Sequence, residues 1–156
     1  MNPLSIYQRV VNEVSDAILA RDIHRLGAMF DFPYLVRGMQ THMVFHALDE
    51  LRPAFETFFT SFANRGVTHY ERVAREADYV RPDRIVGWHY SHIIANGERL
   101  APPRSAGEVL LCRDGHWVVS ESNYPVQDSS WPLTEETLFS QTGFFGRPDD
   151  GWGAEK

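Results

Sequence analysis

The chain has 156 residues, which suits one domain with a single sizeable core. Its net charge of −6 and its 43% of hydrophobic residues are typical of a globular protein and argue against nucleic acid or an anionic membrane as a partner. No stretch approaches the roughly 20 apolar residues that span a bilayer. The single cysteine, Cys112, rules out a disulfide within the chain and indicates a reducing, cytoplasmic location.

Two helices are predicted at the start of the chain. Apolar residues recur at helical spacing over about 5–21, where Ser5 and Gln8 have the spacing of a capping box. Asp22 is placed to cap a second, shorter helix, which Pro33 is expected to end.

A short hairpin, residues 34–37 and 42–46, is expected between the second helix and a third. Pro53 is expected in the first turn of the third helix and Gly66 just after its end. The third helix has an apolar stripe that consists of Leu51, Phe55, Phe58, Phe59 and Phe62.

Long strands are predicted after the third helix, over residues 67–80, 84–95, 107–113 and 116–124. Asn96-Gly97 and Asp114-Gly115 accept positive φ and therefore suit two-residue hairpin turns. Pro102-Pro103 predicts an edge or a bulge before the third of these strands.

The predicted fold class is therefore α+β. Three N-terminal helices pack on a strongly curved, mostly antiparallel sheet, which makes a cone-shaped α+β barrel. Residues 1–126 are expected to form the single domain. Residues 127–156 are expected to form a partly ordered C-terminal extension with a short helix near 134–140.

Two short segments carry a family resemblance. They are Ala20-Arg21-Asp22-Ile23 with Met29-Phe30, and the closing Asp114-Gly115-His116-Trp117-Val118-Val119. Over residues 5–126 the chain resembles the nuclear transport factor 2-like superfamily, which includes the SnoaL-like polyketide cyclases and the ketosteroid isomerases. The resemblance implies a cone-shaped, commonly dimeric protein that often holds a small apolar ligand between sheet and helices.

The resemblance to ketosteroid isomerases is incomplete at the residues that carry their chemistry. Those enzymes use a tyrosine in the first helix, a carboxylate base in the short hairpin, and an acid on the strand before the last turn. Glu108 lies close to the third place. Val14 occupies the first place, and Arg37 and Gly38 occupy the second. Two of the three roles are therefore missing, which argues against steroid isomerase chemistry.

The last hairpin predicts a pair of opposed carboxylates. If Asp114-Gly115 is a two-residue turn, pairing steps outward from it until Glu108 faces Glu121. Like charges placed directly opposite are costly, and burial would raise a carboxyl pKa. The pair is therefore interpreted as an acid and a base in a pocket. Alternatively, this end of the sheet is wet, or arginine side chains neutralise the pair.

A second candidate group consists of Trp88, Tyr90 and His92, which alternate onto one face of their strand. A bulge at Pro102-Pro103 would turn this more apolar face toward Glu108. His92 is then a candidate acid or base, and Tyr90 a hydrogen-bond donor. The alternative is a half-buried histidine without a chemical role.

The sequence thus predicts a protein that binds a small apolar molecule in a pocket between sheet and helices. It acts as a lyase, cyclase or isomerase with carboxylate and histidine acid-base groups, or it is a non-catalytic ligand-binding or dimeric protein-interaction module. The candidate catalytic residues are Glu121, Glu108, His92 and Tyr90. The candidate ligand-binding residues are Trp88, Trp117, Asn123, Phe55, Phe59 and Tyr34.

No metal or cofactor is expected, because His89 and His92 lie three apart in a strand and point to opposite faces. A homodimer is expected through the other sheet face, since no helix remains to cover Val109, Leu111 and Val118.

Overall fold

The computed structural model of the chain describes residues 2–38, 42–124 and 134–140. The elements follow one another as α1 (Pro3–Leu19), α2 (Ile23–Ala28), β1 (Phe30–Arg37), β2 (His42–Phe45), α3 (Leu48–Arg65), β3 (His69–Arg81), β4 (Arg84–Ala95), β5 (Glu98–Arg99), β6 (Arg104–Arg113), β7 (His116–Asn123) and α4 (Glu135–Leu138).

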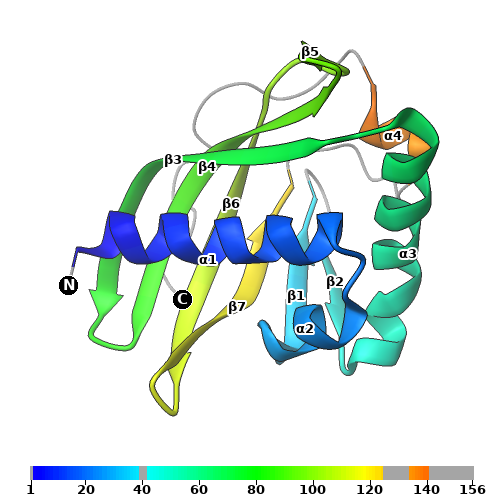
Figure 1. The fold of residues 1–156 in the computed structure, drawn as a ribbon. Helices are drawn as coiled ribbons and strands as arrows, with labels where there is room; N and C mark the ends of the chain where they lie inside the picture. Colours follow the sequence, from blue (N-terminus) through cyan, green and yellow to red (C-terminus); the bar gives the residue numbers. More distant parts are fainter. Residues whose placement is uncertain (1, 39–41, 125–133, 141–156) are drawn as a thin grey trace.

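The strands form one curled sheet in the order β2-β1-β7-β6-β4-β3, with β5 paired to β4 (Figure 1). Its two end strands do not pair with each other, so the sheet does not close into a barrel. Among the described pairs, β1 and β7 run parallel and the others antiparallel. The predicted α+β class and the mostly antiparallel sheet are confirmed.

Helix α1 begins earlier than predicted, because Asn2 caps it. The Asn2 side chain accepts a hydrogen bond from the Leu4 N–H at 2.8 Å. The predicted capping box with Ser5 is absent, since Gln8 binds the sheet instead. Its amide donates to the Arg72 carbonyl at 2.6 Å and accepts from the Ala74 N–H at 2.8 Å, which attaches α1 to β3.

The other predicted helix boundaries are partly confirmed. Asp22 caps α2 by accepting from the Arg25 N–H at 3.0 Å, and Gly66 ends α3 with a φ of 65°. Pro33 does not end α2, because it lies inside β1. Pro53 is the sixth residue of α3 rather than a member of its first turn.

The two predicted hairpin turns are confirmed. Asn96 and Gly97 have φ values of 53° and 76°, and Asp114 and Gly115 have 51° and 83°. At Pro102-Pro103 the pairing on β4 shifts by two residues, from Ile94 with Arg99 of β5 to Ser91 with Arg104 of β6. The predicted interruption is therefore present, but it is not the one-residue bulge that would exchange the two faces.

The pairing of β6 with β7 contains one extra residue on β7. Leu110 faces Val119, but the next residue of β6, Val109, faces Glu121, so Ser120 is left without a partner of its own. From that point Glu108 faces Ser122. The predicted pair of Glu108 with Glu121 is therefore wrong.

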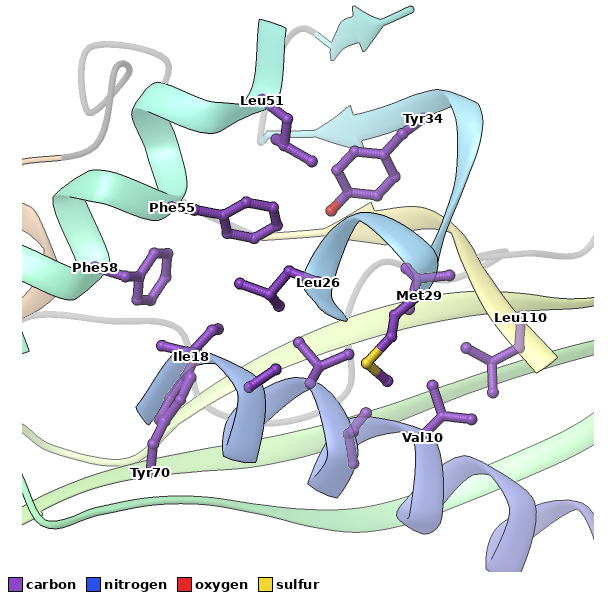
Figure 2. Packing of buried hydrophobic residues seen from close by; sticks show 14 of the residues in the cluster. Val10, Ile18, Leu26, Met29, Tyr34, Leu51, Phe55, Phe58, Tyr70 and Leu110 are labelled. Atoms are coloured by element: carbon purple, nitrogen blue, oxygen red, sulfur yellow. The ribbon is translucent and has the colours of Figure 1, made fainter. Parts of the chain in front are cut away.

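The core lies between the inner face of the sheet and α1, α2 and α3. Helix α1 crosses the sheet and packs most closely on β3 (Figure 1). Figure 2 shows Phe55 and Phe58 pointing from α3 into the space between α3 and α1, where Leu26 of α2 also lies.

Gly87 lets α1 approach the sheet closely. A Cβ atom on Gly87 would lie 2.7 Å from Cδ2 of Tyr7 and 2.6 Å from the backbone oxygen of Glu76. The Tyr7 ring, which is fully buried, therefore fills the place of a side chain on β4.

The outer face of the sheet is less exposed than predicted. Val109, Leu111 and Val118 have exposed fractions of 0%, 8% and 9% in the single chain. The reason given for a homodimer is therefore wrong, and the homodimer itself stays a prediction without that support.

Residues 134–140 pack against the rest of the molecule. The Arg104 guanidinium donates to the carbonyls of Thr137, Leu138 and Ser140 at 3.0, 2.7 and 2.9 Å, and Phe139 is buried. The predicted short helix is confirmed as α4. The remainder of the predicted extension, residues 127–133 and 141–156, lies outside the described residues.

We expect Gly87→Ala to lower the free energy of unfolding by about 1–3 kcal/mol, because the methyl group meets a backbone oxygen and a buried ring. Gly27→Ala is the matched control. Its methyl group meets only the flexible end of Leu48 at 2.7 Å, and alanine favours a helix interior by about 1 kcal/mol over glycine. Urea denaturation followed by circular dichroism measures both variants. Equal losses would contradict the close approach of α1 to β4.

Candidate functional site

Strand register decides which side chains lie on the inner face of the sheet. Glu108 pairs with Gly87 on β4 and with Ser122 on β7, and paired residues share a face. His89, two residues from Gly87, is therefore on the same face as Glu108 and is buried.

The second predicted group is on the outer face. Trp88, Tyr90 and His92 alternate with Gly87 and His89, and they are half-buried there. Trp88 donates to the Glu76 carboxylate at 2.9 Å. The prediction that His92 and Tyr90 face Glu108 is wrong, because the register shift at Pro102-Pro103 is two residues, which leaves the faces unchanged.

The carboxyl group of Glu108 is held by a chain of hydroxyl groups. Its side chain is buried with an exposed fraction of 2%. The Ser122 hydroxyl donates to its Oε2 atom, and the Tyr34 hydroxyl donates to Ser122 Oγ at 2.5 Å. Tyr34 was predicted from the sequence as a ligand-binding residue, whereas Ser122 was not.

Arg72 supplies a buried positive charge beside this carboxyl group. Its exposed fraction is 4%, and its Nη1 atom is 3.8 Å from Glu108 Oε1, within range of an ion pair but too far for a hydrogen bond. Its Nη2 atom donates to the Tyr70 hydroxyl at 3.0 Å, and the guanidinium stacks on the Tyr70 ring. Burial opposes its charge, but Tyr70, Tyr124 and Glu108 outweigh burial and raise the pKa of Arg72.

Glu108 is close to its titration point at neutral pH. Burial raises the pKa of Glu108 from 4.5 to about 7, although the charge of Arg72 and the Ser122 hydrogen bond act to lower it. Burial also raises the pKa values of Tyr34 and Tyr124, so both phenols stay neutral. Both charge states of Glu108 are thus accessible without extremes of pH.

His89 and Tyr7 form a second buried polar pair on the same face. The Tyr7 hydroxyl is 2.7 Å from His89 Nδ1. Burial, and then the charge of Arg72, lower the pKa of His89 well below its usual range, so the imidazole is neutral. This pair packs beneath α1 and does not line the cavity described next.

A cavity lies between α1, α3, β1 and the inner face of the sheet. Its volume, counted as the space open to the centre of a water-sized sphere, is about 40 Å³, so the empty space itself extends a further sphere radius in every direction. Its polar lining residues are Tyr34, Arg72, Glu108 and Tyr124. Its apolar lining residues are Val11, Val14, Ile18, Phe30, Val36, Leu51, Ala54, Phe55, Phe58 and Val119.

The cavity contains three of the predicted site residues, which are Glu108, Tyr34 and Phe55. Phe59 and Trp117 pack against the core beside it without lining it.

The sequence analysis missed Arg72 and Tyr124. Arg72 shares one face of β3 with Tyr70 and Ala74. This grouping of an arginine with a tyrosine and an alanine was the signal in the sequence that could have identified Arg72.

Glu121 and Asn123 lie on the outer face, away from Glu108. Glu121 Oε2 is 3.8 Å from Arg37 Nε, and Glu121 Oε1 is 3.9 Å from Arg84 Nη2. Burial raises the pKa of Glu121, and these two arginines act to lower it. The two carboxylates thus lie on opposite faces, Glu108 near Arg72 and Glu121 between Arg37 and Arg84, so no opposed pair exists for arginines to neutralise.

The described part of the chain contains neither a metal-ligand cluster nor a membrane-spanning helix. No group of three or more His, Cys, Asp or Glu side chains in it is placed to hold a metal ion. No helix in it is both long and apolar enough to cross a membrane.

Comparison with known proteins gives the fold a name. No family model and no curated protein matches the sequence. Among solved structures, an NTF2-like protein of unknown function from Shewanella oneidensis is 10% identical, with a TM-score of 0.61, and the match covers 78% of this chain and 98% of that one. The chain has the nuclear transport factor 2-like fold.

Two other solved structures with this fold carry a name or an activity. A proposed ketosteroid isomerase from Shewanella frigidimarina is 14% identical, with a TM-score of 0.55, and the match covers 76% of this chain and 93% of that one. LinA is 12% identical, with a TM-score of 0.54 and coverages of 76% and 82%. At these identities the likeness concerns the NTF2-like fold alone.

The raised pKa of Glu108 predicts a pH-dependent effect of Glu108→Gln. Between pH 4.5 and about 7 the folded chain keeps a proton that the unfolded chain has released. Raising the pH through this window therefore lowers the stability of the wild type by about 3 kcal/mol through Glu108. Glutamine resembles the protonated form, so we expect the variant to gain up to that amount over the wild type as pH rises.

Urea denaturation of both chains between pH 4.5 and 8 measures this difference. Taking the difference between the chains removes the contribution of neutral His89, which has the opposite sign because the unfolded histidine binds a proton in the acid part of the range. Glu98→Gln, at an exposed carboxylate on β5, is the control for the general effect of removing one negative charge. A constant difference for Glu108→Gln would contradict the burial of this carboxyl group.

Proposed function

We propose that the protein binds a small, mostly apolar molecule in this cavity and that Glu108 transfers a proton to or from it. The observation that carries the proposal is that Glu108 is the one carboxylate among the described lining residues, buried among apolar walls. The proposed isomerase among the structural neighbours supports a reaction of this kind.

The polar groups around Glu108 suit proton transfer. Ser122, itself bonded to Tyr34, holds one carboxyl oxygen, so the carboxyl group has a defined orientation. A pKa of about 7 allows the group to accept a proton as a carboxylate or to donate one as an acid. The apolar walls exclude water, which strengthens the effect of each charge on the reacting molecule.

In the reaction class that we favour, Glu108 takes a proton from a carbon next to a carbonyl group. The electron pair of the C–H bond moves onto the carbonyl oxygen as an enolate. Arg72 and the hydroxyl of Tyr124, which also line the cavity, are available to stabilise that negative charge. Where a C=C bond adjoins the deprotonated carbon, the enolate is conjugated with it, and return of the proton to the far carbon of that bond completes an isomerisation.

The small volume of the cavity favours a second candidate, a non-catalytic ligand-binding protein. A cavity of about 40 Å³ is small, so a ligand that fills it leaves little room for reacting groups to move. The homodimer and the cytoplasmic location also stay predictions.

The test is hydrogen–deuterium exchange next to the carbonyl group of cyclohexanone in D₂O, followed by proton NMR. We expect the wild type to accelerate exchange over buffer, with a rate that rises through pH 7 as Glu108 ionises. Glu108→Gln should lower the rate at least about 100-fold, the usual contribution of a general base. Glu121→Gln is the matched control on the outer face and should keep the activity.

Each other outcome decides between the candidates. Exchange that survives Glu108→Gln would contradict the role of Glu108. Cyclohexanone that raises the melting temperature without exchange above buffer would favour the non-catalytic protein. Absence of both effects would reject the cavity as a site for a small ketone.

A further inference from the structure

Arg72 has hydrogen-bonding capacity that its described surroundings do not use. A guanidinium carries five N–H donors. Tyr70 accepts one of them, and Glu108 lies at ion-pair distance without a hydrogen bond. The Nε atom is buried and has no hydrogen-bond partner among the described residues. Gln8 donates to the backbone carbonyl of Arg72 and not to its side chain, so it occupies none of the guanidinium donors.

Glu108 is the one carboxyl group among the described groups that surround Arg72. Titratable side chains face Arg72 or Glu108 from α1, β1, β3, β4, β6 and the end of β7, and they are Tyr7, Tyr34, Tyr70, His89, Glu108 and Tyr124. Helix α3 adds only apolar side chains to the cavity lining. Burial keeps the phenols of Tyr7, Tyr34 and Tyr124 and the imidazole of His89 neutral, so none of these four adds negative charge beside Arg72 near neutral pH.

Glu108 and an anion in the cavity would therefore compete for one buried cation, Arg72. When Glu108 is protonated, Arg72 has no anionic partner among the described residues, and a buried unpaired charge is costly. An anion that enters the cavity would replace Glu108 as that partner. The planar guanidinium matches a carboxylate, whose two oxygens accept two of its donors.

We propose that the ligand of the cavity is a short carboxylic acid, bound as its anion with the carboxylate on Arg72 and the apolar part against Phe55 and Phe58. The inference rests on the proposed function, since it assumes that the cavity takes a small molecule, and it adds the chemical class. A single cation among apolar walls suits a monoanion, because a phosphate dianion would bring a second, uncompensated charge. In this complex Glu108 holds its proton, so of the two directions of proton transfer proposed above it donates a proton to this ligand rather than accepting one.

The competition also gives binding a defined pH dependence. Above pH 7 Glu108 is ionised in the free protein, so the anion binds only with uptake of a proton. Affinity then falls about tenfold for each pH unit above 7 and changes little below it, by linkage between proton and ligand.

The experiment compares isobutyrate with isobutyramide, which has the same shape and no charge, by titration calorimetry at pH 6 and pH 8. We expect isobutyrate to bind the wild type at least ten times more tightly than the amide at pH 6. Its affinity should fall about tenfold at pH 8. Glu108→Gln should abolish that fall, and Arg72→Met should abolish isobutyrate binding while the amide still binds.

Arg84→Met is the matched control, because Arg84 is a buried arginine paired with a glutamate on the outer face. It should leave isobutyrate binding unchanged. If Arg72→Met does not fold, the comparison of acid with amide in the wild type at the two pH values decides alone.

Equal binding of acid and amide, or isobutyrate binding that survives Arg72→Met, would overturn the inference and leave the proposed function standing. Failure of isobutyrate, isobutyramide and cyclohexanone to bind would overturn both.

Discussion

One extra residue in β7 places a carboxyl group inside the fold. Because Ser120 is inserted opposite the bond between Val109 and Leu110, the residues after it change faces relative to a regular ladder. Glu121 then lies outside and Ser122 inside, opposite Glu108. A regular ladder would put two carboxylates face to face, which is costly. The bulge removes that repulsion and gives the buried carboxyl group a hydroxyl donor instead.

The buried pair of Arg72 and Glu108 is poorly arranged as a stabilising ion pair. The two groups are 3.8 Å apart without a hydrogen bond, and the pKa of the carboxyl group stays raised despite the neighbouring cation. Buried ion pairs often contribute little to stability even with good geometry. This pair lines a cavity and has poor ion-pair geometry. The proposed binding of a small molecule explains that arrangement better than a contribution to folding does.

Much of the fold could be predicted from local chemistry, but the long-range register of the strands could not. Helical periodicity and turn dipeptides that accept positive φ act over a few residues, so the helices and hairpins follow from them. A bulge depends on contacts between strands, and pairing counted outward from the last turn fails at Ser120. The same limit put His92 instead of His89 on the face of Glu108, while Glu108 was identified with the wrong partner. Arg72 depends on packing that no local pattern reveals.

The most direct measurement is the pKa of Glu108 itself. Carbon-13 NMR of the glutamate side-chain carboxyl carbons, followed from pH 4 to pH 9, gives this value, and the signal is assigned by its loss in Glu108→Gln. Burial beside a single cation predicts a titration midpoint of about 7. A midpoint near 4.5, the ordinary value for glutamate, would show that water reaches the carboxyl group and would contradict the account.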